Sequence, residues 1–176
     1  MEENKKKSNT DLWIIIGIII ISVMVVIVGA LYIVLSDIEI NPEYVNEYNE
    51  DALYDNYDDE EFIAWISDTS NTLHFYLRGI AKSADNFDLN LLSYYGEKLE
   101  EKSDIYLLEI HSFDISPDLS AVKAEYYAAL QDTKKAGYYT RLGADNVDAD
   151  YLRYAADYMD KAREHITAAT YYLKEY

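Results

Sequence analysis

The chain of 176 residues contains no cysteine. This absence excludes thiol nucleophiles, disulfide bonds, lipid attachment through cysteine and metal sites built from thiolates. Any folded domain in the chain must therefore be stabilised by its packed core and its polar contacts alone.

Proline and glycine are scarce, with two prolines and six glycines in the whole chain. Turn-rich β-folds use many more of both, because these residues supply the special backbone conformations of tight turns. The composition therefore indicates an all-α protein. The sequence also lacks an Asn-x-Ser/Thr acceptor, so N-linked glycans are not expected.

Basic residues are few compared with acidic ones: 15 Lys and Arg stand against 33 Asp and Glu, giving a net charge of −18. Nucleic acid is excluded as a partner, because phosphate backbones are bound by clustered Lys and Arg. The simplest interpretation of the charge is a hydrated surface that keeps the protein soluble. A cation-rich or high-salt surrounding is the alternative.

One long apolar run stands near the start of the chain. It begins at Leu12, ends at Leu35 and contains no charged residue over 24 positions. A helix of this length measures about 36 Å, enough to cross a hydrocarbon core of about 30 Å. Trp13 and Tyr32 stand near its two ends, where amphipathic rings favour the membrane interface. The sequence therefore predicts a transmembrane helix over residues 12–35.

Two small residues in this run, Gly17 and Gly29, would let another helix approach closely, although they do not form a GxxxG pattern. A cleaved signal peptide is a rival interpretation, but its apolar region is normally about 7–15 residues long. A type IV pilin leader is a second rival. We favour an uncleaved anchor.

The orientation of the anchor follows from its flanks. Lys5, Lys6 and Lys7 precede the run, and no Lys or Arg follows it until Arg78. The positive-inside rule then leaves residues 1–11 as a short cytoplasmic tail and places everything after the anchor outside the cytoplasm. We therefore expect a single-pass protein of the cell membrane, with the lipid bilayer as its first partner.

Residues 36–59 form an acidic stretch rich in Asn and Tyr, without helical or strand periodicity. Repulsion between its carboxylates favours an extended linker. A calcium loop would need glycine at its sixth position and oxygen ligands at alternating positions, and neither requirement is met. No dedicated cation site is expected here.

Residues 60–176 carry four apolar patterns with helical spacing, which predict four amphipathic helices. The predicted core positions are Phe62, Ile66, Thr69, Leu73, Tyr76 and Ile80; Leu92, Tyr95, Leu99, Tyr106, Ile110 and Phe113; Leu119, Val122, Tyr126, Leu130, Thr133 and Gly137; and Leu152, Ala155, Met159, Ala162, Ile166, Ala169 and Leu173. Short connections favour an up-down-up-down four-helix bundle. A tetratricopeptide-like pair formed by the last two helices is the competing fold.

Local signals predict where these helices begin and end. Asp88 and Asp148 are expected to cap the helices that follow them. Ser116 followed by Pro117 predicts the start of the third helix, with the serine as its cap. Gly143 is expected to end that helix, because glycine tolerates the left-handed conformation found there.

Candidate chemistry is sparse in this sequence. The three histidines, His74, His111 and His165, lack the Glu-x-x-His spacing of a bundle metal site. No nucleophile elbow, zinc-protease motif or phosphate-binding loop occurs. We therefore expect neither enzymatic activity nor a bound cofactor or metal.

Tyrosine is unusually frequent, with 19 residues, and four adjacent pairs recur at 94–95, 126–127, 138–139 and 171–172. Adjacent helical residues point about 100° apart, so one ring of a pair can enter the core while the other lies at its edge. Tyrosines at the edge of the core are the simpler interpretation. The functional alternative is an aromatic interaction surface, with Tyr94, Tyr127, Tyr138 and Tyr171 as candidates.

Three functions fit these features. The first is a non-enzymatic interaction module or accessory subunit on the outer face of the membrane, with a protein partner or a second copy bound to it. The second is a sensor bundle that binds a small ligand or a cation outside the cytoplasm. The third is a surface structural protein that assembles with itself.

Overall fold

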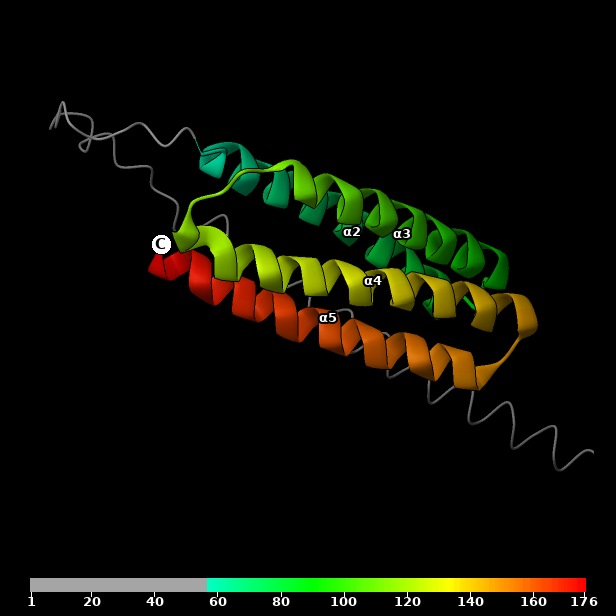
Figure 1. The fold of residues 1–176 in the computed structure, drawn as a ribbon. Helices are drawn as coiled ribbons and strands as arrows, with labels where there is room; N and C mark the ends of the chain where they lie inside the picture. Colours follow the sequence, from blue (N-terminus) through cyan, green and yellow to red (C-terminus); the bar gives the residue numbers. More distant parts are fainter. Residues whose placement is uncertain (1–56) are drawn as a thin grey trace, which may run out of the picture.

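A computed structural model describes residues 57–176, which form an all-α four-helix bundle (Figure 1). The helices are α2 (Asp59–Asp85), α3 (Leu89–Glu109), α4 (Ser120–Asn146) and α5 (Ala149–Glu175). Successive helices run antiparallel; α3 packs against α2 and α4, and α4 packs against α5. The predicted bundle is thus confirmed for this part of the chain.

The predicted anchor and its topology signals lie outside the described residues. These are Lys5, Lys6 and Lys7, the run from Leu12 to Leu35 with Trp13, Gly17, Gly29 and Tyr32, and the linker up to residue 56. Within residues 57–176, no helix combines the length and hydrophobicity that a bilayer-spanning segment requires.

The start of α2 is tied to the connection between α3 and α4. Asp58 and Asp114 exchange hydrogen bonds of 2.8 Å: the Asp58 amide donates to the Asp114 carbonyl, and the Asp114 amide donates to the Asp58 carboxylate. The Ser116 amide donates to the Asp59 carboxylate, also at 2.8 Å. The acids that favour the positive end of the helix dipole therefore also fix a loop distant in sequence.

The predicted cap of α3 is present, whereas the helix stops before Ile110 and Phe113, the last two positions of its predicted core pattern. The Asp88 carboxylate accepts from the Leu91 amide at 3.0 Å. The helix ends at Glu109 and is followed by a 3-10 turn, Ile110–Ser112. Phe113 has extended backbone, yet its ring still reaches the core, 5.4 Å from that of Phe62 and 5.3 Å from that of Trp65. A loop residue thus supplies the apolar group that the pattern assigned to the helix.

Both ends of α4 also differ from the expectation. Pro117 begins a 3-10 turn, Pro117–Leu119, and α4 starts only at Ser120, while the Ser116 hydroxyl is buried and makes no capping bond. At the other end the helix continues past Gly143 to Asn146, and Val147 takes the left-handed conformation with φ of 53°. Gly143 serves packing instead, because a Cβ there would lie 2.6 Å from the Leu152 side chain.

The α4–α5 connection otherwise follows the prediction. Asp148 caps α5 by accepting from the Asp150 amide at 2.8 Å. Most predicted core positions of the two helices are buried: Leu119, Val122, Tyr126, Leu130, Thr133 and Gly137, and Leu152, Ala155, Met159, Ala162 and Ala169. The helical periodicity therefore identified the face that each helix turns inward.

Glycine permits an unusually close approach of α3 and α4. A Cβ on Gly137 would lie 2.5 Å from the Glu100 nitrogen, and a Cβ on Gly96 would lie 2.9 Å from the Gly137 carbonyl oxygen. The backbones of the two helices are thus in direct contact at this crossing. No larger residue fits at Gly137 unless the helices separate.

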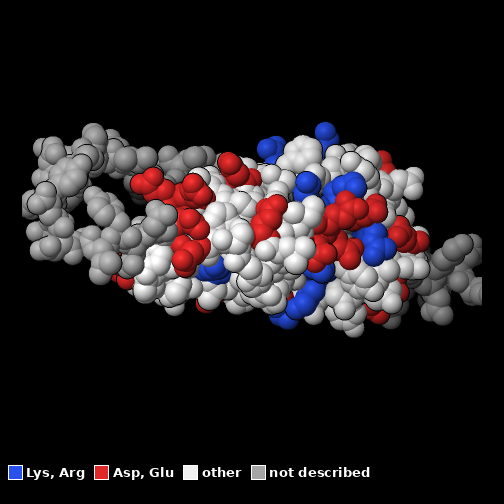
Figure 2. Space-filling view, turned by 45° about the horizontal axis from the view of Figure 1, so that its top comes forward, with Lys and Arg blue, Asp and Glu red and all other residues white. Residues whose placement is uncertain are grey.

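Charge is unevenly distributed over the face shown in Figure 2, where acidic side chains gather at the end of the bundle that contains the start of α2. The first turn of α2 contributes Asp59, Glu60 and Glu61. Toward the other end, acidic and basic side chains are mixed. The acidic end would be repelled by an anionic surface.

Candidate functional site

Tyrosine rings from α4 and α5 form a stacked cluster on the bundle. Tyr139 lies parallel to Tyr158, with 2° between the ring planes and 5.5 Å between centroids. It also stacks on Tyr151 at 6.1 Å and 22°. Tyr151 and Tyr158 are seven residues apart, about 10.5 Å along a helix, so Tyr139 fits between them. Tyr154 completes the cluster, 5.6 Å from Tyr139 and 46% exposed.

Two lysines lie over the Tyr158 end of this cluster. The Nζ atom of Lys135 is 5.0 Å from the Tyr158 ring centroid, and that of Lys161 is 4.8 Å from it. Ammonium groups at these distances are attracted to the electron-rich ring face. The cluster therefore presents aromatic surface next to positive charge, in a chain whose net charge is strongly negative.

The same pair of helices continues into a group of charged side chains. His165 of α5 lies between two carboxylates of α4, with Nδ1 2.6 Å from Glu125 Oε2 and Nε2 3.8 Å from Asp132 Oδ2. The Lys135 Nζ atom is 3.3 Å from Asp132 Oδ1, which connects this group to the tyrosines. We call the whole surface the α4–α5 seam: Glu125, Asp132, Lys135 and Tyr139 with Tyr151, Tyr154, Tyr158, Lys161 and His165.

The His165 group is a network of polar contacts between α4 and α5. The two ring nitrogens lie on opposite edges of the imidazole, so Glu125 and Asp132 approach it from different sides. Within residues 57–176, no three His, Asp or Glu side chains are arranged to hold a metal ion. The network fixes the ring orientation and joins α4 to α5.

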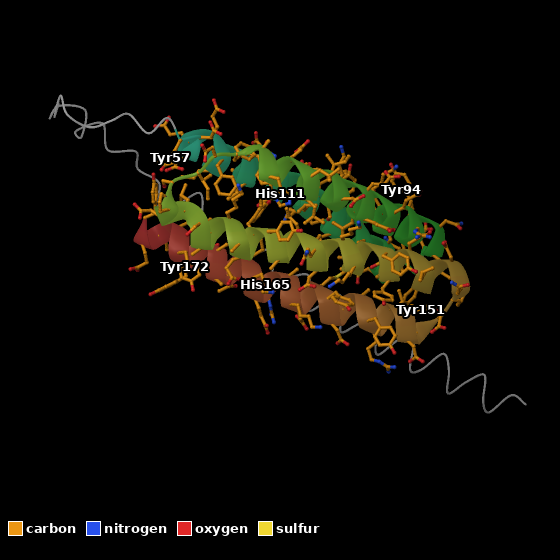
Figure 3. The ribbon with its side chains drawn as sticks, in the orientation of Figure 1. Tyr57, Tyr94, His111, Tyr151, His165 and Tyr172 are labelled. Atoms are coloured by element: carbon orange, nitrogen blue, oxygen red, sulfur yellow. The ribbon has the colours of Figure 1, made fainter. Side chains whose placement is uncertain are left out.

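The other two histidines, His74 and His111, lie away from the α4–α5 seam. His111 is exposed just after α3, and its ring lies 5.3 Å from that of Tyr127. His74 is half-buried on α2; burial, and secondarily the positive charge of Arg78, lower its pKa. Figure 3 shows His111 and His165 on different parts of the bundle. The histidines do not form one site.

The lowered pKa of His74 predicts a pH dependence of stability. The unfolded chain binds a proton at this residue more readily than the folded one, so the free energy of unfolding should fall as pH drops through about 6.5. His74→Gln should weaken this dependence, as measured by urea unfolding at about pH 7.5 and about pH 5.5. His111→Gln, an exposed histidine, is the control. Equal pH dependence of the natural chain and His74→Gln would contradict the prediction.

The four tyrosines predicted to form an interaction surface lie on three helices. Each is at least as accessible as its neighbour in the pair: Tyr94 is 48% exposed, Tyr138 39% and Tyr171 61%, while Tyr127 is half-buried beside the fully buried Tyr126. Tyr94 points away from α3 near one end of the bundle, and Tyr172, the neighbour of Tyr171, lies near the other (Figure 3). These positions do not make up a single continuous patch.

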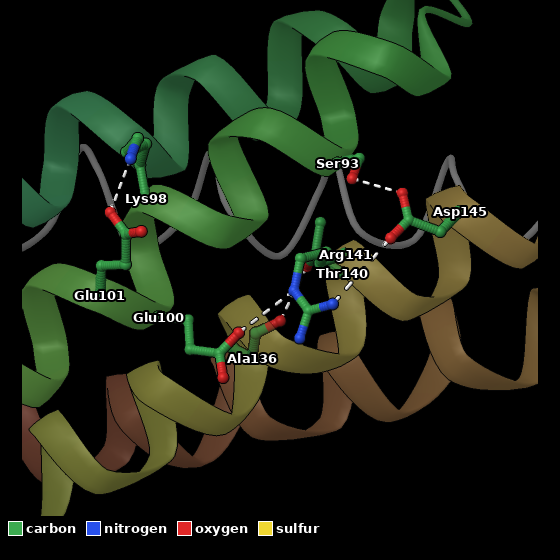
Figure 4. Close-up of polar contacts among 8 residues, drawn as sticks. All are labelled: Ser93, Lys98, Glu100, Glu101, Ala136, Thr140, Arg141 and Asp145. Atoms are coloured by element: carbon green, nitrogen blue, oxygen red, sulfur yellow. Dashed lines mark hydrogen bonds and ion pairs between the residues drawn. The ribbon is translucent and has the colours of Figure 1, made fainter.

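Tyr138 lies beside a polar network between α3 and α4, whose side chains Ser93, Glu100, Arg141 and Asp145 are shown in Figure 4. The Arg141 guanidinium lies 5.5 Å from the Tyr138 ring centroid. Its Nε is 3.3 Å from Glu100 Oε2, and its Nη1 is 4.0 Å from Asp145 Oδ2. The Ser93 hydroxyl donates to Asp145 at 2.5 Å. The contact with Arg141 therefore places Tyr138 next to these charged side chains.

The sequence interpretation missed the α4–α5 seam because it treated the tyrosines as adjacent pairs. The relevant signal is the spacing of Tyr151, Tyr154 and Tyr158, which lie on one face of α5. Their partner Tyr139 comes from the other helix of the hairpin. The chain matches no protein-family model, and comparisons with curated proteins and with solved structures also gave no match, so inference about function starts from these side chains.

Proposed function

We propose that the protein is a membrane-anchored, non-enzymatic interaction module on the outer face of the cell membrane, and that it docks a protein partner through the α4–α5 seam. The observation that carries the proposal is the tyrosine cluster around Tyr139. Stacking fixes these rings before a partner arrives, so little side-chain entropy is lost on binding. Tyrosine is also among the residues enriched at the centres of protein interfaces.

The charges of the seam indicate the kind of partner surface that fits. Lys135 and Lys161 flank the rings, while Asp132 and Glu125 lie farther along. A partner with an apolar ridge, bordered by a carboxylate at one end and a basic group at the other, would complement this order. Such complementary charges set the orientation and raise the association rate more than they raise affinity.

The test is cross-linking of intact native membranes, followed by capture through a C-terminal tag and mass spectrometry. Tyr154→Ala should reduce recovery of the partner about tenfold, as expected for a residue at the centre of an interface. Tyr171→Ala, a more exposed tyrosine elsewhere on α5, is the matched control and should leave recovery unchanged. Thermal unfolding of both variants checks that the bundle is intact.

Two outcomes would contradict the proposal. Equal recovery from the natural chain and Tyr154→Ala would remove the seam as the docking surface. Antibody labelling of the C-terminal tag only after cells are permeabilised would place the bundle on the wrong side of the membrane.

A further inference from the structure

The outer face of α3 exposes apolar side chains toward both of its ends. Leu91 is 46% exposed, Tyr94 48%, Ile105 43% and Leu108 74%. Together with Lys98 and Glu101 they are spaced by three and four residues, so the six lie on one face of the helix. We call this set the α3 stripe. Large side chains exposed in a row in this way are typical of an interaction surface.

The α3 stripe is complementary to the same stripe of a second copy that runs antiparallel to it. Reversal about its midpoint places Leu91 opposite Leu108, Tyr94 opposite Ile105, and Lys98 opposite Glu101. An antiparallel second copy would therefore meet apolar groups with apolar groups and the ammonium with the carboxylate. A surface that contacts an identical surface about a two-fold axis must have this property.

We propose that α3 pairs antiparallel with α3 of a second copy of this chain, with the two-fold axis between Lys98 and Glu101. Each Lys98 then lies close to Glu101 of the other copy, in addition to the 2.6 Å contact within its own helix. The stripe carries one positive and one negative charge, so it forms a neutral band on a chain with a net charge of −18.

A residue of α2 widens this surface. Phe75 is 61% exposed, and its ring lies 6.4 Å from that of Tyr95, which in turn lies 5.3 Å from that of Tyr94. The aromatic side chains thus continue from the stripe onto the neighbouring helix. In the antiparallel pair, this extension lies next to the other copy's Ile105–Leu108 region.

We expect the affinity between the two copies to be low in solution. Glu97 and Lys102 border the stripe on opposite sides. In the antiparallel pair each of them faces the same residue of the other copy near the axis, so like charges meet and weaken the pair. We expect a contact made by one helix of each copy to bury less than the roughly 1,200 Å² of a standard interface. Confinement to one membrane would raise the effective concentration and favour the pair. The α3 stripe and the α4–α5 seam are separate surfaces, so docking at one can fail without affecting the other.

Cysteine cross-linking of the full chain in membranes tests the pairing and its direction, because the natural sequence has no cysteine. Chains with Leu91→Cys mixed with chains with Leu108→Cys should form a disulfide-linked dimer. Each variant alone should not, because in the antiparallel pair its cysteines are about 25 Å apart. Tyr171→Cys is the control for random collision.

Charge reversal provides the second measurement, using energy transfer between labelled full-length chains in the same membranes. Lys98→Glu alone or Glu101→Lys alone should reduce the dimer about tenfold, because like charges then meet at the axis. Mixing the two variants should restore it, although neither retains the ion pair within its own helix. Three results would each overturn the proposal. The first is a disulfide-linked dimer from Leu108→Cys alone, and the second is a yield of the mixed dimer no greater than with Tyr171→Cys. The third is a failure of the mixed charge variants to restore the dimer.

Discussion

Replacing Gly137 with alanine should lower the free energy of unfolding of the bundle by about 2 kcal/mol. The new Cβ would lie 2.5 Å from the Glu100 nitrogen and 2.7 Å from the Gly96 carbonyl oxygen. Both are backbone atoms of α3 and cannot rotate away, so the two helices must move apart. Alanine favours a helix over glycine by about 1 kcal/mol, which offsets part of the strain but not all of it.

The matched control for this prediction is the same substitution at Gly79. The nearest atoms to a Cβ there belong to the Tyr95 ring, at 2.5 to 2.6 Å, and a half-buried ring can shift by rotating about its side-chain bonds. Gly79→Ala should therefore cost less than Gly137→Ala in chemical unfolding experiments. If the two cost the same, or if Gly137→Ala stabilises the bundle, then the backbone contact does not limit the packing of α3 against α4.

Helical periodicity predicted the inward faces because it depends only on the spacing of apolar residues. The core positions Val122, Leu130 and Leu152 are fully buried as expected. The ends of the helices were less predictable, because one residue type serves several purposes. Gly143 was interpreted as a stop signal, whereas it makes room for Leu152, and Val147 takes the left-handed position.

The α4–α5 seam also depends on where this turn lies. With the turn centred on Val147, Tyr139 stands eight residues before it and faces position 155, between Tyr151 and Tyr158. Asp132 stands fifteen residues before the turn and faces position 162, within one helical turn of His165. The register of the hairpin thus brings the whole seam together, and it depends on α4 continuing past Gly143 to Asn146. Side-chain pairing between helices cannot be read from periodicity until the turn is fixed.

Replacing Tyr126 with alanine should destabilise the bundle by about 4 kcal/mol, the largest effect we expect from a single truncation. The ring is 1% exposed and lies 5.7 Å from that of Trp65 in an edge-to-face arrangement. Its hydroxyl is 2.7 Å from Thr69 Oγ1 and 3.1 Å from Ser70 Oγ. The side chain therefore fills the space between α4 and α2 and joins the two helices by hydrogen bonds.

Tyr126→Phe separates the two contributions of this residue. It keeps the ring and removes the hydroxyl, at an expected cost of about 1 kcal/mol near neutral pH. The cost is modest because the Thr69 hydroxyl still has the Trp65 and Ile66 carbonyl oxygens, at 2.7 and 3.2 Å, as acceptors. Urea unfolding of both variants measures the two costs; a similar loss for Phe and Ala would show that the hydroxyl dominates over the ring.

At alkaline pH, the buried hydroxyl of Tyr126 should lower the free energy of unfolding of the bundle. Burial raises the pKa of Tyr126 from 10.0 to about 12, because an ionised phenolate is poorly solvated inside the bundle. The unfolded chain ionises first as pH rises above 10, so stability is retained below that value and lost between 10 and about 12, by about 2 kcal/mol for this residue.

Tyr126→Phe lacks this loss, so its free energy of unfolding should fall less steeply over the same pH range. Tyr154→Phe, which removes a hydroxyl from an exposed ring, controls for the number of tyrosines, and parallel alkaline curves for the natural chain and Tyr126→Phe would disprove the assignment.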